Sequence, residues 1–292
     1  RELQNCAHFH LGVRIFMETI SSVKPLLAIA VSLFGSLLII AAGRKPNLRE
    51  SCSILIALVK FGIVLSMVPL VLKGTEITYN LKVIFHGVGI AFRVDSLGLL
   101  FALVASSLWV VTTIYSIGYM RPLKEHSQTR YFTFFALAIS SAIGVAFSAN
   151  LLTLYLFYEM LSLSTYSLVT HHQDQEARFA GRKYLSYLMG TSIAFLLPAV
   201  ILTYVFTGTL DFADQGILSG KAGDGMLILM FVLFIAGIGK AAIMPMHSWL
   251  PSAMVAPTPV SALLHAVAVV KVGVFSVLRI CFHVFGIDLM HS

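Results

Sequence analysis

Ionisable side chains interrupt several long apolar stretches of this sequence, and these residues could do chemistry. Glu159 lies in "LLTLYLFYEMLSLSTYSLV", Lys240 follows "LILMFVLFIAGIG", and His265 and Lys271 lie in "VSALLHAVAVVKVGVF". Inserting such a group into a membrane costs at least about 2.5 kcal/mol, so each needs a partner, a water-filled cavity or a role. Protons can move between buried groups when burial and neighbouring charges adjust their proton affinities. The pattern therefore favours a proton path.

Within this path, Glu159 and Lys240 would form a switch. While the carboxylate is close, the lysine holds its proton, and when the carboxylate is drawn away the lysine can release it. Lys183, which opens the apolar stretch 183–207, would extend the path. The alternative is that Glu159 and Lys240 are a structural ion pair without any role in transport.

Other candidates also have purely structural explanations. Lys60 lies about two turns from the end of its apolar stretch and could extend to the membrane surface, as long basic side chains do. Lys183 adjoins a basic loop and could mark the interface. His247 precedes Trp249 near an expected helix end, which is typical of an interfacial anchor. His265 could be a hydrogen-bonded packing residue.

Prolines predict that the helix carrying Lys240 is broken. Pro245, Pro251, Pro257 and Pro259 lie in "GKAAIMPMHSWLPSAMVAPTPV", which cannot keep a continuous hydrogen-bond ladder. Irregular backbone at membrane depth is tolerated only where protein or water satisfies its polar groups. We therefore expect an interrupted helix, a loop and a second helix around a hydrated interior. On an ideal second helix His265 and Lys271 would lie about 240° apart, unless a π-bulge brings them together.

The elements that must position these residues are membrane-spanning helices. A bilayer core requires about 20 apolar residues per helix. The sequence "GTEITYNLKVIFHGVGIAFRVDSLG" instead alternates and predicts a surface β-hairpin between the second and third helices. The stretches that qualify as helices are 23–42, 52–72, 94–117, 130–148, 150–169, 183–207, 226–247 and 258–285.

Composition excludes a soluble globular domain. Of the 292 residues, 58% are hydrophobic and 11% are charged, which indicates an all-α polytopic membrane protein in contact with lipid. The formal net charge is +7, but no basic cluster with interleaved aromatics points to nucleic acid. Cys6, Cys52 and Cys281 form no CxxC pair, and the sequence contains no HExxH or GxGxxG motif. We therefore expect no metal site, no cofactor and no catalytic centre.

Basic residues in alternate loops predict the orientation, because Lys and Arg are retained on the cytoplasmic side. Both ends of the chain are then expected on the non-cytoplasmic face of the plasma membrane. The basic residues of these loops are Arg44, Lys45, Arg49, Arg121, Lys124, Arg178 and Arg182.

The sequence also suggests how the chain is divided. Met17 looks like a natural start, so we interpret residues 1–16 as an upstream segment. We interpret residues 17–128 as three helices with the hairpin, and residues 129–292 as the conducting helices.

The segments "FRVDSLGLLFALVASSLWVVTTIYSIGYM", "LLTLYLFYEMLSLSTYSLV", "KYLSYLMGTSIAFLL" and "GKAAIMPMHSWLPSAMVAPTPVSALLHAVAVVKVGVF" resemble the proton-conducting antiporter-like membrane subunits. This family occurs in respiratory complex I, membrane-bound hydrogenases and Mrp-type cation/proton antiporters. The resemblance covers nearly everything after Phe92. It implies a fold with two inverted half-channels, each holding a discontinuous helix, and this chain would contain the first.

By matched motif, the resemblance implies that Glu159, Lys183 and Lys240 are the conducting glutamate and lysines, and that His265 and Lys271 pass protons onward. It implies H⁺ and Na⁺ as transported ions, other membrane subunits as partners and no cofactor. The presence of both His265 and Lys271 in the stretch 258–285 resembles the pattern of the D-type subunit of Mrp antiporters. Because the second half-channel is missing, we expect the chain to be an N-terminal fragment. A redox-driven complex, a non-conducting scaffold and bicarbonate-linked transport stay open as alternatives.

Overall fold

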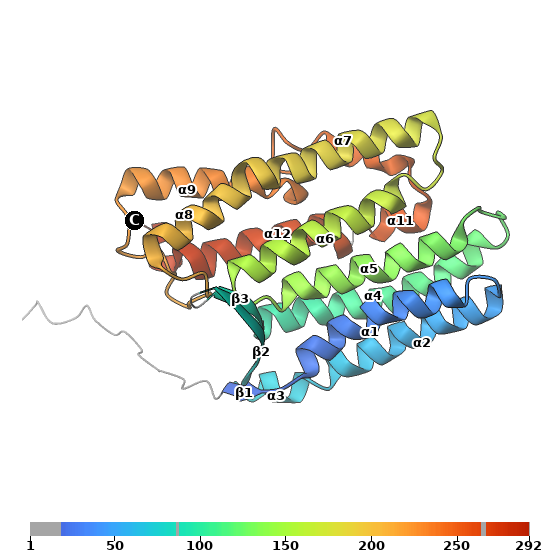
Figure 1. Ribbon diagram of the computed structural model, residues 1–292, viewed down its shortest axis with the longest axis horizontal. Coiled ribbons are helices and arrows are strands. Elements are labelled where there is room, and N and C mark those ends of the chain that lie inside the picture. The colour runs from blue at the N-terminus through green and yellow to red at the C-terminus, as the bar shows by residue number, and fades with distance from the viewer. Residues whose placement is uncertain (1–18, 86–87, 264–266, 292) are drawn as a thin grey trace, which may run out of the picture.

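The computed structural model describes residues 19–85, 88–263 and 267–291, which form a bundle of long helices with a small sheet at one end (Figure 1). The helices are α1 Lys24–Ala41, α2 Pro46–Leu65, α3 Val68–Leu72, α4 Ser96–Met120, α5 Gln128–Ala146, α6 Leu151–Val169, α7 Gln175–Thr191, η1 Ser192–Leu196, α8 Leu197–Thr207, α9 Asp224–Gly237, η2 Gly239–Ala241, α10 Trp249–Ser252, η3 Ala253–Val255, α11 Thr258–Leu263, α12 Val270–Arg279, η5 Ile280–Phe285 and α13 Ile287–His291.

Among the described residues, five helical stretches are long and apolar enough to cross a membrane. They confirm a mostly helical, multi-pass membrane protein. The stretch expected at 183–207 starts earlier, because α7, η1 and α8 form one continuous helical path from Gln175 to Thr207. The five are Lys24–Ala41, Pro46–Leu72, Ser96–Met120, Gln128–Ala146 and Gln175–Thr207.

Side-chain caps fix where three of the helices begin. Asp95 accepts a hydrogen bond from the Gly98 backbone N–H at 2.8 Å at the start of α4. Asn150 and Asp174 do the same at 2.7 Å for α6 and α7. Such caps satisfy backbone donors that have no partner inside the helix, and therefore fix the register of each helix.

The small sheet confirms the expected hairpin and adds a strand. Strands β2 (Glu76–Phe85) and β3 (Val88–Val94) pair antiparallel, with Ile77 opposite Val94. Strand β1 (Thr19–Ser21) pairs parallel to β2, so the order is β1-β2-β3. A strand of three residues has no detectable alternation, which is why the sequence did not predict it.

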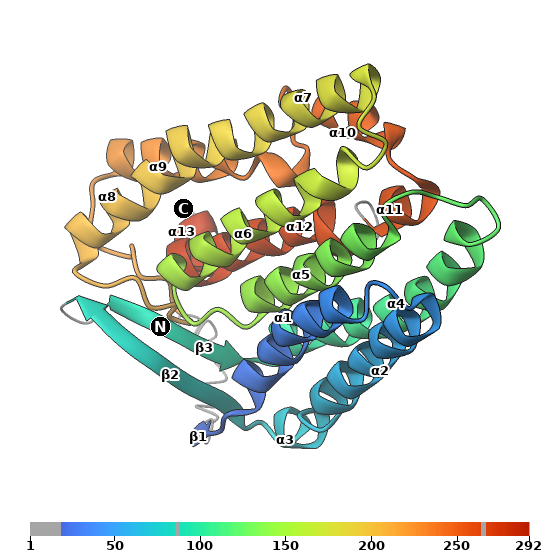
Figure 2. The same ribbon diagram turned by 45° about the vertical axis from the view of Figure 1, so that its right-hand side comes forward.

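Helix α5 lies at the centre of the bundle, packed against α1, α4 and α6 (Figure 2). The loops that follow α1, α4 and α6 meet at the end opposite the sheet. Thr129 at the start of α5 donates to the Gly43 carbonyl at 3.3 Å, and the His126 ring contacts the His171 carbonyl at 2.9 Å. The basic residues of these loops therefore gather at one end of the molecule.

The predicted helix break exists, but it lies before the prolines. Helix α9 ends at Gly237, and the chain continues through the single 3₁₀ turn η2. The expected helix 226–247 is therefore too long, because Gly237 and Gly239 already weaken the helix and Ala242 adopts a left-handed backbone with φ of 53°. Lys240 lies inside the break rather than on the helix.

Candidate functional site

Lys240 is fully buried and bonded to one turn of α6. Its Nζ donates to the Tyr158 carbonyl at 2.8 Å and to Ser162 Oγ at 2.5 Å. The Lys240 backbone N–H also donates to the Tyr158 hydroxyl at 3.2 Å. The break in the helix therefore presents a buried ammonium group to neutral oxygen acceptors.

Glu159 is the carboxylate whose charge acts on Lys240. It lies on α6, one residue after Tyr158, and both of its carboxylate oxygens are buried. Neither oxygen has a hydrogen-bond partner among the described residues. A buried carboxylate without partners is costly, so this position requires water, a proton or a moving cation. The structure thus brings the two predicted groups into electrostatic contact without a direct bond.

A group of buried hydroxyls adjoins Lys240, and sequence reasoning missed it. Beyond Ser162, the Thr165 hydroxyl lies 2.6 Å from both the Leu161 carbonyl and the Tyr184 hydroxyl on α7, and 3.2 Å from the Ser162 carbonyl. Tyr158, Ser162 and Thr165 are spaced by four and three residues, so they form one stripe on α6. That spacing could have identified them, together with their position around Glu159.

His247 lies in the loop after the break, and Lys183 on α7 contacts the short helix that follows this loop. Lys183 Nζ, on α7, donates to Ser252 Oγ on α10 at 3.0 Å. His247 is exposed, whereas Trp249 is fully buried and its indole N–H donates to the Gly239 carbonyl at 3.0 Å. Trp249 therefore supports the break rather than anchoring an interface.

The four prolines line this same loop region. Pro245 precedes α10 and borders a cavity beside the end of α9, and Pro251 lies within α10. Pro257 precedes α11, and Pro259 lies in its first turn. The prolines thus keep the segment between α9 and α12 in short helical turns.

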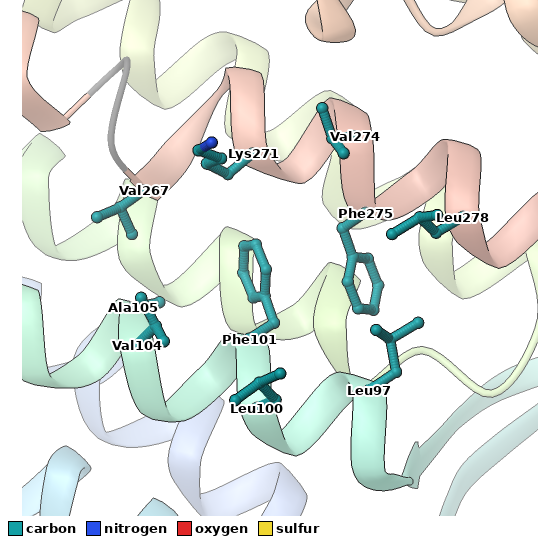
Figure 3. A pocket seen from close by; sticks show the side chains of 10 residues that line it. All are labelled: Leu97, Leu100, Phe101, Val104, Ala105, Val267, Lys271, Val274, Phe275 and Leu278. Atoms are coloured by element: carbon teal, nitrogen blue, oxygen red, sulfur yellow. The ribbon is translucent and has the colours of Figure 1, made fainter.

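Lys271 is exposed on α12 and is not brought to Lys240. It borders a cavity of about 270 Å³ between α4 and α12, whose other lining residues are apolar, as Figure 3 shows. Gly273, about 200° further around the helix, packs instead against Ala241 in the break. His265, the predicted neighbour of Lys271, lies outside the described residues.

Lys60 is fully buried between α1, α2 and α4. Its Nζ donates to Ser32 Oγ at 2.7 Å and lies 5.2 Å from the centroid of the Trp109 ring. This placement does not fit a side chain that extends to the membrane surface. It puts a second buried lysine in the N-terminal helices, away from Glu159.

A buried ion pair ties α4 to α12, and the sequence did not reveal it. The fully buried Arg279 guanidinium bonds both carboxylate oxygens of Asp95, including one at 2.7 Å. Asp95 precedes the membrane-spanning part of α4. Burial raises its pKa, but the hydrogen bonds and charge of Arg279, aided by the Gly98 N–H, leave that pKa below its usual value. Asp95 is therefore ionised in the folded protein at neutral pH.

Two protein-family models match the chain. Residues 148–291 match the NADH:quinone oxidoreductase/Mrp antiporter membrane family. Residues 85–132 match the N-terminus of chain 5 of NADH-ubiquinone oxidoreductase (complex I). The first match contains Glu159, Lys183, Lys240 and Lys271, which are all the described residues of the predicted path.

Relatives and solved structures agree with these matches. Antiporter subunit mnhA2 of Staphylococcus haemolyticus is 32% identical over 219 residues, covering 73% of this chain and 27% of the relative. The mnhA2 subunit of Staphylococcus aureus strain JH9 is 33% identical over 198 residues, covering 66% of this chain and 24% of the relative. The chain therefore spans about a quarter of the length of these relatives.

Among solved structures, an archaeal membrane-bound sulfane sulfur reductase, a respiratory membrane complex, matches with a TM-score of 0.77 and 25% identity, covering 89% of this chain and 53% of the other. The Mrp complex from Dietzia sp. DQ12-45-1b has the same fold, with a TM-score of 0.76 and 22% identity, covering 89% of this chain and 48% of the other. The chain belongs to the family of antiporter-like membrane subunits shared by NADH:quinone oxidoreductases and Mrp antiporters.

Proposed function

We propose that this chain is the proton-conducting first half of an antiporter-like subunit in a multisubunit Mrp-type Na⁺/H⁺ antiporter. The observation that carries this proposal is the pairing of Lys240, fully buried in a helix break, with Glu159, whose buried carboxylate has no hydrogen-bond partner among the described residues. A structural ion pair would place the two groups in direct contact. A separated pair in an interrupted helix suits a group that must gain and lose a proton.

In this proposal Lys240 carries the proton, and Glu159 controls how tightly Lys240 binds it. Approach of the carboxylate favours the protonated lysine, and its withdrawal favours release of the proton. Neutral oxygens of Tyr158 and Ser162 hold the side chain in place in both states. Lys183, joined to α10 through Ser252, continues the path on one side.

The path continues on the other side through His265 and Lys271. Lys271 borders an apolar cavity where a further helix of the same assembly would bury it. Lys60 and His247 stay outside this path: Lys60 is enclosed by other helices, and His247 is exposed beside the break.

The finer architecture is also part of the proposal. Eight membrane crossings, with a discontinuous helix at α9–η2, would form the first half-channel of an inverted repeat, with 129–292 as its conducting part. The basic residues at the end opposite the sheet support a cytoplasmic location for that end. Both described ends of the chain would then face away from the cytoplasm.

The partners are other membrane subunits, and the ions are H⁺ and Na⁺. Support comes from the antiporter subunits and the Mrp complex that the chain resembles. The relatives are mnhA2 subunits, whereas the presence of both His265 and Lys271 favours a D-type subunit. The subunit type is best assigned by complementation of strains that lack one subunit each.

Everted membrane vesicles containing the full-length subunit and its partners test the proposal. Addition of Na⁺ should collapse a preformed pH gradient without an electron donor, and Lys240→Ala should abolish this collapse. Lys82→Ala, which removes an exposed lysine of β2, is the matched control and should behave as wild type. Undiminished collapse in assembled Lys240→Ala complexes would refute the assignment.

A second candidate is the proton-pumping subunit of a redox-driven complex. The match to an archaeal respiratory membrane complex favours it. In that case Na⁺ alone would leave the pH gradient intact, and an electron donor would drive proton pumping that Lys240→Ala abolishes. A substrate requirement beyond cations would indicate bicarbonate-linked transport instead.

A further inference from the structure

Two loops at the end opposite the sheet bring together four residues that the proton path does not use. Glu125 and His126 lie between α4 and α5, and His171 and His172 lie between α6 and α7. We call these four residues the loop cluster. His126 and His171 are 45 positions apart in the chain, so the cluster cannot be recognised from a local sequence motif.

Three histidine nitrogens face one carboxylate oxygen in the loop cluster. Glu125 Oε2 lies 3.8 Å from His126 Nδ1, 3.9 Å from His171 Nε2 and 4.0 Å from His172 Nδ1. These distances are too long for hydrogen bonds. Glu125 Oε2 therefore has three imidazole nitrogens at nearly the same distance and is hydrogen-bonded to none of them.

The hydrogen bond of His126 determines which of its nitrogens is free. His126 Nε2 lies 2.9 Å from the His171 carbonyl oxygen, which can only accept, so Nε2 carries the hydrogen. In the neutral ring Nδ1 then has a lone pair directed toward Glu125. Two facing acceptors repel each other unless a cation lies between them. The second ring nitrogen of a metal-bound histidine commonly donates to a backbone carbonyl in this way.

His171 supplies an independent indication of a missing ligand. Its side chain is fully buried, and neither ring nitrogen has a hydrogen-bond partner among the described residues. A buried imidazole with two unsatisfied nitrogens is rare in folded proteins.

We propose that Glu125, His126 and His172 bind a divalent first-row transition metal ion, with Zn²⁺ as the reference ion and His171 Nε2 as the fourth ligand. The ligand atoms of the first three residues all lie within 4.8 Å of one another. Around a tetrahedral zinc ion such atoms would be about 3.4 Å apart, so the two distances from Glu125 Oε2 would close by about half an ångström and the remaining separation by up to about 1.4 Å. Imidazole and carboxylate ligands suit this class of ion.

The metal ion would clamp the α4–α5 loop to the α6–α7 loop. Helices α5 and α6, which these loops flank, are neighbours in the bundle, so the clamp would fix their ends relative to each other. The proposal departs from the sequence-based expectation of no metal site. It does not depend on the proton path, because none of its ligands takes part in that path.

Zinc binding to the purified complex with the full-length subunit tests the proposal. The complex should carry an affinity tag without histidines, be stripped with a chelator and then be titrated with ZnCl₂. We expect the wild-type complex to bind one more equivalent of Zn²⁺ than the His172→Ala complex and to have a higher Tm with zinc than without it. When Co²⁺ replaces Zn²⁺, the wild-type complex should show the visible d–d absorption of a tetrahedral site. His172 is suited to substitution because its ring is partly exposed, so its loss leaves no buried group unpaired.

Two further variants make the result decisive. His172→Cys, which keeps a zinc ligand, should restore the equivalent that His172→Ala loses. His247→Ala removes an exposed histidine elsewhere in the chain and should bind zinc as the wild type does. Equal zinc stoichiometry and equal Tm shifts in wild type and His172→Ala would overturn the proposal.

Discussion

The environment of Lys240 fits a proton carrier better than a lysine held in a structural ion pair. Its hydrogen bonds go to the Tyr158 carbonyl and Ser162 Oγ, which accept from the protonated amine without fixing its charge. Glu159, which would fix the charge, acts on it without a bond. A proton carrier requires this balance, because a lysine held by a direct carboxylate contact would release its proton only at high cost.

Ser162→Ala should slow proton transport about fivefold, which corresponds to about 1 kcal/mol, because the buried ammonium loses one of its two hydrogen-bond acceptors. Initial rates of pH-gradient collapse in vesicles measure the effect. Ser164→Ala is the matched control, since the Ser164 hydroxyl is buried on the same helix but bonds only the Leu161 carbonyl. Equal rates in the two variants would exclude a role for Ser162.

At the residue scale, the sequence indicated the ionisable groups inside apolar stretches, and it missed the neutral groups around them and the ion pair at the helix ends. Glu159 and Lys240 are conspicuous because each is an ionisable side chain within an apolar stretch. Tyr158 and Ser162 are common in any helix, so their type alone carries no signal. Arg279 was missed because a basic residue near a helix end is usually interfacial, and its partner Asp95 is 184 positions away.

At the scale of elements, close backbone packing positions the break. A Cβ atom on Gly273 of α12 would lie 2.2 Å from the Ala241 nitrogen and 2.5 Å from the Lys240 carbonyl carbon. Neither atom belongs to a flexible side chain, so any side chain at 273 must displace the turn that carries Lys240. Prolines in the sequence predicted an interruption, but its exact position depends on this contact between α12 and η2.

Gly273→Ala should therefore destabilise the protein by about 1–3 kcal/mol, as overpacking typically does, and impair transport as well. Thermal unfolding of the purified complex, read alongside transport rates, measures both effects. Gly118→Ala in α4 is the control, because a Cβ there meets nothing within 4 Å and alanine favours the helix. A Gly273→Ala variant as stable and active as Gly118→Ala would contradict the packing argument.

Asp95→Asn should destabilise the protein by about 3–5 kcal/mol, because it leaves the buried Arg279 charge without its partner. The pKa of Asp95 is lower in the folded state than its unfolded value of about 3.9. Its contribution is therefore present above pH 3.9 and is lost as the pH falls through the folded pKa.

Melting curves between pH 3 and 6 should accordingly show the difference between wild type and Asp95→Asn shrinking at the acidic end. Asp214→Asn is the control: the Asp214 side chain is 69% exposed, so this substitution should leave the free energy of unfolding within about 0.5 kcal/mol of wild type. A difference that stays constant down to pH 3 would show that Asp95 acts by packing rather than by charge.

At the scale of the whole molecule, apolar side chains cover the outside as well as the inside. Phe34, Leu55, Leu100 and Val205 are each more than half exposed, as expected for surfaces that face lipid or partner subunits. The helical class followed from the sequence, because membrane spans have a strong hydrophobic signal. The meeting of distant loops at one end depends on tertiary packing and has no sequence pattern.

Proton transport by Glu159→Gln complexes tests the central claim most directly, because the substitution removes the charge and keeps the shape. Rates in vesicles should be measured beside the amount of assembled complex. We predict normal assembly and a loss of transport of about a hundredfold, the effect of removing a group that assists proton transfer. Transport at the wild-type rate, in complexes that assemble normally, would show that the Glu159–Lys240 pair does not carry protons.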